Sequence, residues 1–288
     1  MSSTRQLKSR IRSVKSNKQI TKAMELVAAS KLRRAQDATR ASSAYAQAAR
    51  ELLTQLSTLT DVRRTTFYQE RPVKARLVLL ITSDRGLAGA YNANAIKQFL
   101  ALLRDDQAKG IRTEVICAGR RGAQFAARLK GVDVVGVYAG LPEHLTAADI
   151  RPVLVSAVDR FVDELVDAVS VITTRFVSSF VQTAEQFQLL PAVFAATDVS
   201  HDIAQATFEP SVDEVLEGAT IRLLEAQFYQ ALLDAKASEH SMRRAAMKNA
   251  TDNASELIDD LTLEMNKVRQ AGITQELSEI SAGVEAMK

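Results

Sequence analysis

Glycine and proline, the two residues that most readily break helices, are missing from long segments towards both ends of this 288-residue chain. The first proline is Pro72 and the first glycine is Gly86, and neither residue type occurs from Ala219 to Ala271. Eight of the eleven glycines fall between Gly86 and Gly140. This distribution predicts two long terminal helices on either side of a punctuated middle.

The lengths of the two predicted helices constrain the fold. At 1.5 Å per residue, helices over 4–59 and 212–286 would be roughly 84 and 110 Å long. A single globular core cannot cover helices of that length, so they must support one another or a partner. We therefore expect a mechanical or scaffolding chain with a coiled-coil helix in 1–60, a central domain in 72–200 and a second coiled-coil helix in 210–288.

Apolar residues in both terminal segments repeat at alternating spacings of three and four residues. This is the a/d seam of a two-stranded coiled coil. The repeats in the N-terminal segment are Leu7-Ile11-Val14, Ala28-Leu32-Ala35 and Tyr45-Ala49-Leu52-Leu56-Leu59. The repeats in the C-terminal segment are Leu216-Ala219-Leu223-Ala226 and Ala250-Ala254-Leu257-Leu261.

The first seam is interrupted by polar residues. Lys18, Thr21 and Glu25 stand where it should continue, and a second apolar stripe, Ile20-Met24-Val27, lies on a shifted face. One interpretation is a register drift in a long helix. The other is that this stretch contacts something besides its partner helix.

The net charge of +3 conceals an asymmetry between the two ends. Residues 1–40 contain eleven Lys/Arg and two acidic residues, whereas residues 211–288 contain eight Lys/Arg and fourteen acidic residues. A basic and an acidic helix attract each other, weakly where the charges are exposed. An antiparallel pair closed by the middle domain is the simplest topology.

The middle of the chain alternates between strand and helix patterns. Strands are expected at 76–82, 113–118, 132–137, 169–177 and 180–190, and helices at 93–109, 123–130 and within 146–167. Alternation of this kind predicts a parallel, Rossmann-like sheet. The expected fold class is thus α/β, with a long antiparallel coiled coil formed by both termini.

No pattern in the sequence predicts catalysis, a cofactor or a metal. The loop Ser83–Asn92 has glycines three apart and lacks both G-x-G-x-x-G and G-K-[ST], so we interpret it as a structural turn. His144, His201 and His240 lack metal-ligand spacing. Cys117 is the one cysteine and lies in an apolar run, which indicates a core residue and excludes an internal disulfide.

Long motifs at three places resemble the γ subunit of F-type rotary ATP synthase, of the bacterial type, and the resemblance covers the whole chain in the right order. They are the segments 10–35, rich in basic residues and alanine, 82–92, with the sequence TSDRGLAGAYN, and 241–277, which contains SMRRAAM and NKVRQAGITQEL. No segment approaches the apolar length that spans a bilayer, and the N-terminus lacks a signal-peptide h-region. Because the resemblance begins at about Thr4, we expect the basic N-terminus to be mature protein rather than a transit peptide.

The resemblance implies a central stalk. In this family the coiled coil enters a ring of three α and three β subunits, and the lower coil and the α/β domain contact the ε subunit and the c-ring. The shaft turns with the c-ring and couples proton flow to ATP synthesis or hydrolysis, while the nucleotide sites lie on other chains. The implied location is peripheral, on the cytoplasmic face of the bacterial plasma membrane, with membrane association only through the complex.

The resemblance also implies which residues contact the catalytic subunits. Arg269 and Gln270 would form polar contacts with a β-subunit loop, and other residues would lie on the shaft surface near β. Those other residues are Lys22, Met24, Arg33 and Arg34. The residues of the matched central-domain loop are Asp84, Arg85, Gly86 and Gly89.

Two other function classes remain open from the residues alone. The first is a nucleic-acid-binding or scaffolding coiled coil, because the basic helix could track phosphates. The basic stripe lacks interleaved aromatic residues, which disfavours it, and the family resemblance implies no nucleic-acid partner. The second is a nucleotide-dependent α/β enzyme with helical extensions, which the missing phosphate motif and catalytic set disfavour.

Overall fold

The computed structural model describes residues 4–59, 66–192 and 211–286. His201 and the side chains of one predicted seam lie outside the described part. The seam residues concerned are Tyr45, Ala49, Leu52, Leu56 and Leu59.

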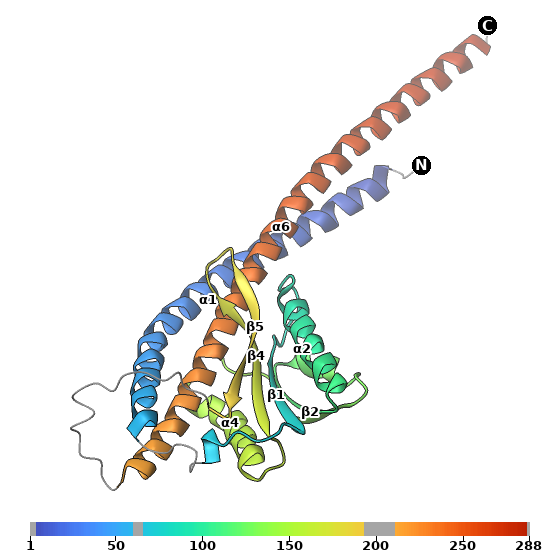
Figure 1. Cartoon of the computed structure of the whole chain (residues 1–288). Coiled ribbons are helices and arrows are strands. Elements are labelled where there is room, and N and C mark those ends of the chain that lie inside the picture. Colours follow the sequence, from blue (N-terminus) through green and yellow to red (C-terminus); the bar gives the residue numbers. More distant parts are fainter. Residues whose placement is uncertain (1–3, 60–65, 193–210, 287–288) are drawn as a thin grey trace. The chain divides into compact units, whose positions relative to one another are not determined.

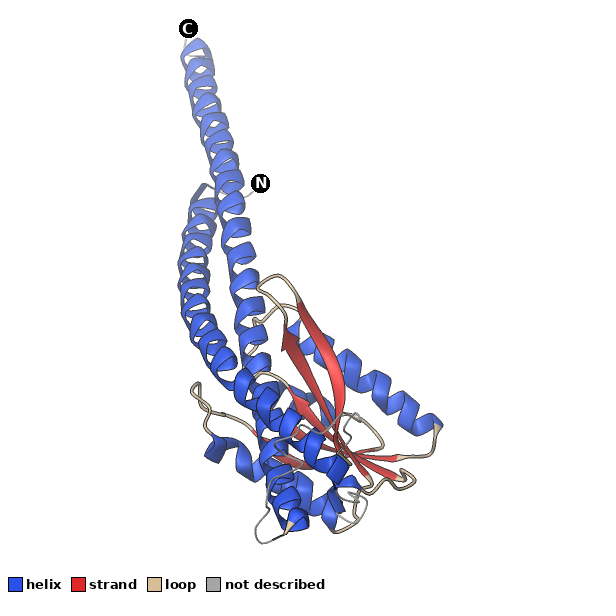
Figure 2. Cartoon of the chain, turned by 60° about the vertical axis from the view of Figure 1, so that its left-hand side comes forward, coloured by secondary structure: helices blue, strands red, loops and turns tan. Residues whose placement is uncertain are grey.

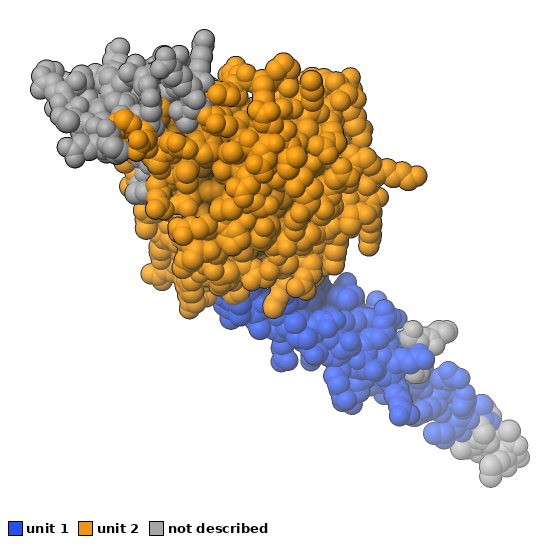
Figure 3. Space-filling view, turned by 90° about the horizontal axis from the view of Figure 1, so that it is seen from below, with its two compact units in different colours: residues 1–29, 243–288 blue, residues 30–242 orange. Residues whose placement is uncertain are grey.

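The chain divides into two compact units, shown in different colours in Figure 3. Unit 1 consists of residues 1–29 and 243–288, and unit 2 consists of residues 30–242. Unit 1 is helical throughout its described part, and the whole sheet lies in unit 2.

The two breaker-free segments form the two long helices that the sequence predicts. Helix α1 runs over Thr4–Leu59 and helix α6 over Val212–Ala286, which gives them 56 and 75 residues. A helix of such length has little intrinsic reason to persist alone in water, because most helical stability comes from packing of an apolar face. Each helix contributes to both units, so each is stabilised by two different surroundings.

In unit 1, α1 and α6 pair antiparallel, as predicted. Leu7 and Ile11 of α1 pack with Leu261 of α6 in one apolar cluster. Further along α1, the hydroxyl of Thr21 accepts a hydrogen bond of 2.8 Å from the hydroxyl of Thr251. Residue numbers rise along α1 while those of their partners fall along α6, which defines the antiparallel direction.

The predicted seam of α6 is wrong at one position. Leu257 is 45% exposed, and Ile258 beside it packs against Leu7, Ile11 and Leu261 instead. The spacing of three and four residues admits two phases here, and the apolar cluster selects the other one. The buried or half-buried positions of α6 in the described part of this unit are Arg243, Ala246, Met247, Ala250, Thr251, Ala254, Ser255, Ile258, Leu261, Thr262, Met265, Asn266, Val268 and Gly272.

The seam of α1 continues in register through its polar interruption. Lys18, Thr21 and Glu25 are half-buried at the positions the heptad assigns to them, so a register drift is not needed. Two residues of the shifted stripe face outward, because Ile20 and Val27 are 55% and 56% exposed, whereas Met24 between them is half-buried.

Unit 2 is built on a five-stranded sheet with the order β3-β2-β1-β4-β5. The four strands β1 to β4 run parallel, which confirms the expected Rossmann-like arrangement. Strand β5 pairs antiparallel with β4, so the expectation of a wholly parallel sheet is wrong at this edge. Residues 177–181 join β4 to β5, and so short a connection permits a hairpin but not a crossover. The strands are β1 (Ala75–Ile81), β2 (Arg112–Ala118), β3 (Val132–Tyr138), β4 (Ala168–Phe176) and β5 (Gln182–Leu190).

Helices cover both faces of this sheet, as Figures 1 and 2 show. Alternation along β1 decides which side chains face which layer. Leu77 and Leu79 lie in the cluster with α4 and α6, whereas Val78 and Leu80 lie in the cluster with Phe99 of α2. The remaining helices are α2 (Tyr91–Ala108), α3 (Arg120–Ala126), α4 (Ala147–Val162) and the short 3-10 helix η2 (Thr66–Tyr68).

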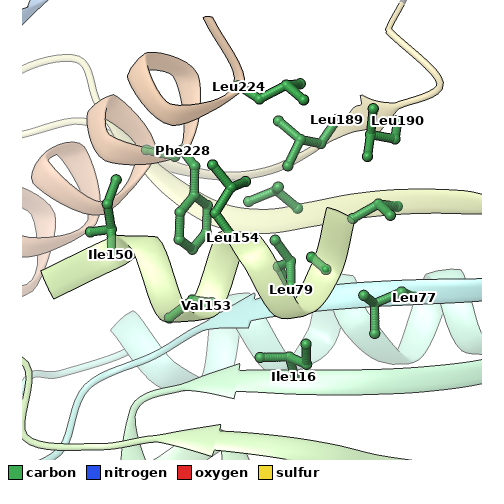
Figure 4. Packing of buried hydrophobic residues seen from close by; sticks show 14 of the residues in the cluster. Leu77, Leu79, Ile116, Ile150, Val153, Leu154, Leu189, Leu190, Leu224 and Phe228 are labelled. Carbon is green, nitrogen blue, oxygen red and sulfur yellow. The ribbon is translucent and has the colours of Figure 1, made fainter. Parts of the chain in front are cut away.

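Helix α6 is part of the central core of unit 2. Phe228 is fully buried and points towards Ile150 and Leu154 of α4 (Figure 4). Leu224 of α6 lies in the same cluster as Leu189 of β5. The 75-residue helix α6 is thus also a core element of unit 2.

Candidate functional site

The loop after β1 is closed by its own hydrogen bonds. The Asp84 carboxylate accepts from the backbone N–H of Arg120, at 3.0 Å, and from that of Gly140, at 2.9 Å. The side-chain amide of Asn92 donates to the Ser83 hydroxyl at 2.8 Å. Asp84 thereby ties the end of β1 to the start of α3 and to the segment after β3.

Gly86 and Gly89 of this loop are each required for a different structural reason. Gly89 has φ of 55°, in the left-handed region that favours glycine. A Cβ on Gly86 would lie 2.8 Å from a guanidinium nitrogen of Arg121, so the side chain of Arg121 covers Gly86. Arg85 is exposed. The predicted loop residues therefore lie together at the carboxyl ends of the parallel strands.

The carboxyl ends of the parallel strands are where sheets of this type bind ligands. Here they border a hollow of only about 40 Å³, lined among others by Asp84 and Gly119. Leu232, Ala235 and Lys236 of α6 close it from the other side. Ligand pockets usually measure about 300–1,000 Å³.

A second polar cluster in unit 2 joins two helices and a loop, and no sequence pattern indicates it. Glu143 lies between β3 and α4, and its carboxylate contacts Lys31 of α1 at 2.7 Å and His240 of α6 at 2.5 Å. The hydrogen bond with His240, and then the contact with Lys31, hold the pKa of Glu143 well below its usual range. Glu143 and His240 are 97 residues apart in the sequence.

Lys22 and Met24, two of the residues expected to lie near the β subunit, belong to unit 1. Lys22 is exposed and forms an ion pair of 3.0 Å with Glu25 on the next turn. Met24 is half-buried. The exposed Ile20 and Val27 share this stretch of α1, so it presents apolar as well as cationic groups to the solvent.

The other expected contact residues are exposed. Arg269 and Gln270 lie just beyond Val268, the last half-buried residue of the seam that packs against α1. They are not near Lys22. Thr251 pairs with Thr21, and the 18 residues from Thr251 to Arg269 correspond to roughly 27 Å along the helix.

Arg33 and Arg34 belong to unit 2 and are exposed on α1. Arg34 borders a hollow of about 70 Å³ beside Glu143. Arg33 and Arg34 therefore follow Lys31, the α1 member of the polar cluster, by two and three residues.

The C-terminal end of α6 is almost entirely exposed to solvent. All side chains from Arg269 to Ala282 are exposed except Gly272, which is half-buried. Three large apolar residues stand out in water: Ile273 at 51%, Leu277 at 61% and Ile280 at 65% exposure. An apolar helix tip of this kind indicates a protein partner.

Two searches of the described ranges 4–59, 66–192 and 211–286 gave negative results. They contain no group of three or more His, Cys, Asp or Glu residues placed to hold a metal ion. No helix among them has both the length and the apolar character needed to span a membrane.

Comparisons with known proteins give one consistent result. Residues 3–287 match the family model described as ATP synthase. The chain is 42% identical to the ATP synthase gamma chain of Opitutus terrae, over 98% of both chains. It is 41% identical to that of Roseiflexus castenholzii, over all of this chain and 99% of the relative. It is 38% identical to that of Xylella fastidiosa, over the full length of both.

Solved structures show the same fold at low identity. A chain of the Euglena gracilis mitochondrial ATP synthase (OSCP, F1 and c-ring, rotational state 3) matches with a TM-score of 0.68 at 16% identity. The match covers 99% of this chain and 94% of that one. A chain of the Tetrahymena thermophila central stalk and c-ring structure matches with a TM-score of 0.60 at 19% identity, over 80% and 99%. With the full-length relatives above, the protein belongs to the ATP synthase gamma chain family.

Proposed function

We propose that this chain is the central rotor shaft of an F-type ATP synthase. It transmits torque between an ion-driven c-ring and the catalytic α and β subunits, and so couples proton flow to ATP synthesis or hydrolysis. The observation that carries the proposal is the antiparallel pairing of α1 and α6 in a chain related to gamma chains along its whole length. A shaft needs long uninterrupted helices, and both are present.

The chain itself carries no catalytic site in this proposal. The hollow at the carboxyl ends of the strands is far too small for a nucleotide, and α6 side chains line it. Asp84 already accepts the N–H groups of Arg120 and Gly140, to which an incoming anion would bind. ATP chemistry then takes place on partner subunits, and this chain needs no cofactor.

The proposed partners are the α and β subunits, the ε subunit and the c-ring. The exposed tip of α6, with Ile273, Leu277 and Ile280, would lie within the ring of α and β subunits. Polar contacts with β would come from exposed side chains on both helices. The proposed contact residues are Lys22, Met24, Arg33, Arg34, Arg269 and Gln270.

The proposed location follows from the partners. The chain would lie at the cytoplasmic face of a bacterial plasma membrane and associate with it only through the complex. The division into a first coiled-coil helix (1–60), a Rossmann-like domain (72–200) and a second coiled-coil helix (210–288) is part of the same proposal.

Reconstitution tests this function directly. Purified chain is mixed with the α and β subunits encoded by the same genome, and ATP hydrolysis and the rotation of a bead attached to unit 2 are measured. The expected result is hydrolysis that depends on the chain, with stepwise rotation in one direction. A complex that hydrolyses ATP equally well without the chain would contradict the proposal. Salt-sensitive binding of generic DNA by the chain would favour the nucleic-acid alternative.

A further inference from the structure

The segment between β3 and α4, residues 139–146, contacts both long helices of unit 2 through one side chain. One carboxylate oxygen of Glu143 accepts a hydrogen bond from Lys31 of α1 at 2.7 Å, and the other lies 2.5 Å from Nε2 of His240 on α6. His240 is 5% exposed, whereas the side chains of Glu143 and Lys31 are 33% and 39% exposed. Glu143 is therefore a polar bridge between a loop of the α/β unit and both helices.

Helix α6 has further ties to the same segment. The Lys236 ammonium donates to the carbonyl oxygens of Leu141, at 3.4 Å, and Pro142, at 2.5 Å. The Tyr229 hydroxyl donates to the carbonyl of Leu145 at 2.9 Å. Tyr229, Lys236 and His240 are spaced by seven and four residues, so they share one face of α6. With Phe228 in the core as well, α6 is anchored to the α/β unit in several ways.

In unit 2, α1 buries Leu32, but its described side chains at the hollow between α4 and α6 are small. They are Ala38, Ala41 and Ser42, and this hollow measures about 560 Å³. Ala35 and Ala38 border the smaller hollow next to Glu143. Small side chains facing hollows make few dispersion contacts and interlock poorly, so they offer little resistance to sliding. A directional, charge-assisted hydrogen bond does resist it.

We propose that Glu143 is a positioning residue that locks α1 to the α/β unit, so that torque applied to this unit passes into both helices of the shaft. The proposal rests on the proposed rotor function. Lys31 and His240 stand close, along the sequence, to the points where α1 and α6 pass from unit 2 into unit 1. The proposed lock thus joins α1 and α6 near the ends of their unit 2 portions.

The charges around Glu143 keep the lock closed over a wide pH range. Lys31 and Arg34 face it from α1, and Lys236 and His240 from α6, with Glu239 as the nearby acid on that helix. Because this surrounding is mostly cationic, the carboxylate remains ionised, and its pKa lies well below the usual range, chiefly through the His240 hydrogen bond. Its two oxygens face Lys31 and His240 separately, whereas an amide would present an oxygen to one of them and an NH₂ group to the other.

The test compares hydrolysis with proton pumping in the complete ATP synthase reconstituted into lipid vesicles. Glu143→Gln removes the charge with almost no change of shape, and Lys31→Met removes the α1 partner. We expect ATP hydrolysis within about twofold of wild type, because the shaft still turns in the catalytic ring. ATP-driven pumping per ATP hydrolysed should fall about threefold or more as the gradient grows, because a lost charge-assisted bond lets the shaft slip under load. The double variant should be no worse than either single one, because both substitutions break the same bridge.

Glu225→Gln is the matched control. Glu225 accepts from Arg151 of α4 and Arg222 of α6, so it also bridges elements of unit 2, but not through α1. It should leave the ratio of pumping to hydrolysis unchanged. Ratios equal to wild type in both Glu143→Gln and Lys31→Met would overturn the lock. Should Glu143→Gln fail to fold, Lys31→Met decides the matter, since Lys31 is 39% exposed. If the wild-type chain supports no hydrolysis at all, the proposed function falls, and the lock with it.

Discussion

The two units use the same helix in opposite ways. In unit 2, α6 is a core element whose leucines and Phe228 are surrounded by α4 and the sheet. In unit 1, the continuation of α6 is buried along one narrow seam, and its described side chains beyond Val268 are almost all exposed. Unit 2 can stabilise itself by burial of apolar surface, whereas unit 1 leaves much of its surface for partners. The stability of the chain should therefore reside mainly in unit 2, and its proposed contacts with the β subunit mainly in unit 1.

The largest effect is expected from truncating the core of unit 2. Phe228→Ala removes a fully buried aromatic ring and should lower the free energy of unfolding of unit 2 by about 3–5 kcal/mol. Denaturant titration monitored by far-UV circular dichroism measures this loss. A change below about 1 kcal/mol would mean that α6 is not a core element and would break the comparison.

Truncation of the seam in unit 1 should cost less and act locally. Leu261→Ala should destabilise the coil by about 2–3 kcal/mol, near the lower end for leucine, because the narrow seam can collapse around the site. Hydrogen exchange should speed up around Thr251 and Val268 while β1 stays protected. Leu257→Ala is the control, because Leu257 is 45% exposed and should change exchange very little. Equal acceleration of exchange in unit 2 would show that the two units unfold together.

Substitution beyond the seam should affect activity and leave stability unchanged. Arg269 and Gln270 are exposed, so Arg269→Ala or Gln270→Ala should leave the thermal transition of the isolated chain unchanged within about 0.5 kcal/mol. In the complex, a lost hydrogen bond involving a charged group is worth about 1.5–3 kcal/mol, enough to slow coupled ATP synthesis roughly tenfold or more. Synthesis at the wild-type rate by both variants would make these side chains bystanders.

The smallest predicted effect concerns an acid within unit 2. Burial raises the pKa of Asp234 from 3.8 to about 6, with Gln230 and Arg175 opposing the shift and Glu185 adding to it. Because the folded-state pKa is raised, the protonated group's stabilising contribution is complete below the ordinary pKa and is lost as pH rises to about 6. Asp234→Asn should therefore stabilise unit 2 at pH 7 by about 1 kcal/mol, after allowance for the partial exposure of the carboxyl group.

Melting curves at pH 4 and pH 7 measure this effect. The stabilisation by Asp234→Asn should be present at pH 7 and nearly absent at pH 4. Asp252→Asn, at an exposed site on the same helix, should be neutral at both. Equal effects of Asp234→Asn at both pH values would exclude titration of Asp234 as the cause.

The sequence predicted those parts of the fold that depend on local patterns. Missing glycine and proline predicted the extent of both long helices, and the alternation of strands and helices predicted the α/β sheet. The direction of β5 was missed because strand propensity does not encode pairing direction, although the short connection at 177–181 contained the signal. Leu257 was placed on the seam because spacing alone cannot choose between two neighbouring phases of a helix.

The polar cluster of unit 2 was beyond sequence reasoning. Glu143 and His240 are ordinary surface-type residues in their local sequence, and only tertiary packing brings them together across 97 positions. Lys31 looked like one more cation of a basic helix. The expected β-subunit contacts, by contrast, came from the family resemblance, and their exposure is compatible with that role without testing it.

The hydroxyl pair of Thr21 and Thr251 has a consequence for the dimensions of the rotor. A seam of alanines and leucines repeats every seven residues, so a shifted alignment would bury nearly the same apolar area. Moving one helix by a heptad would carry each threonine about 10 Å away from the other and break the hydrogen bond between their hydroxyls. This one polar layer therefore fixes the register of the two helices, and the register sets how far the tip of α6 reaches beyond the start of α1.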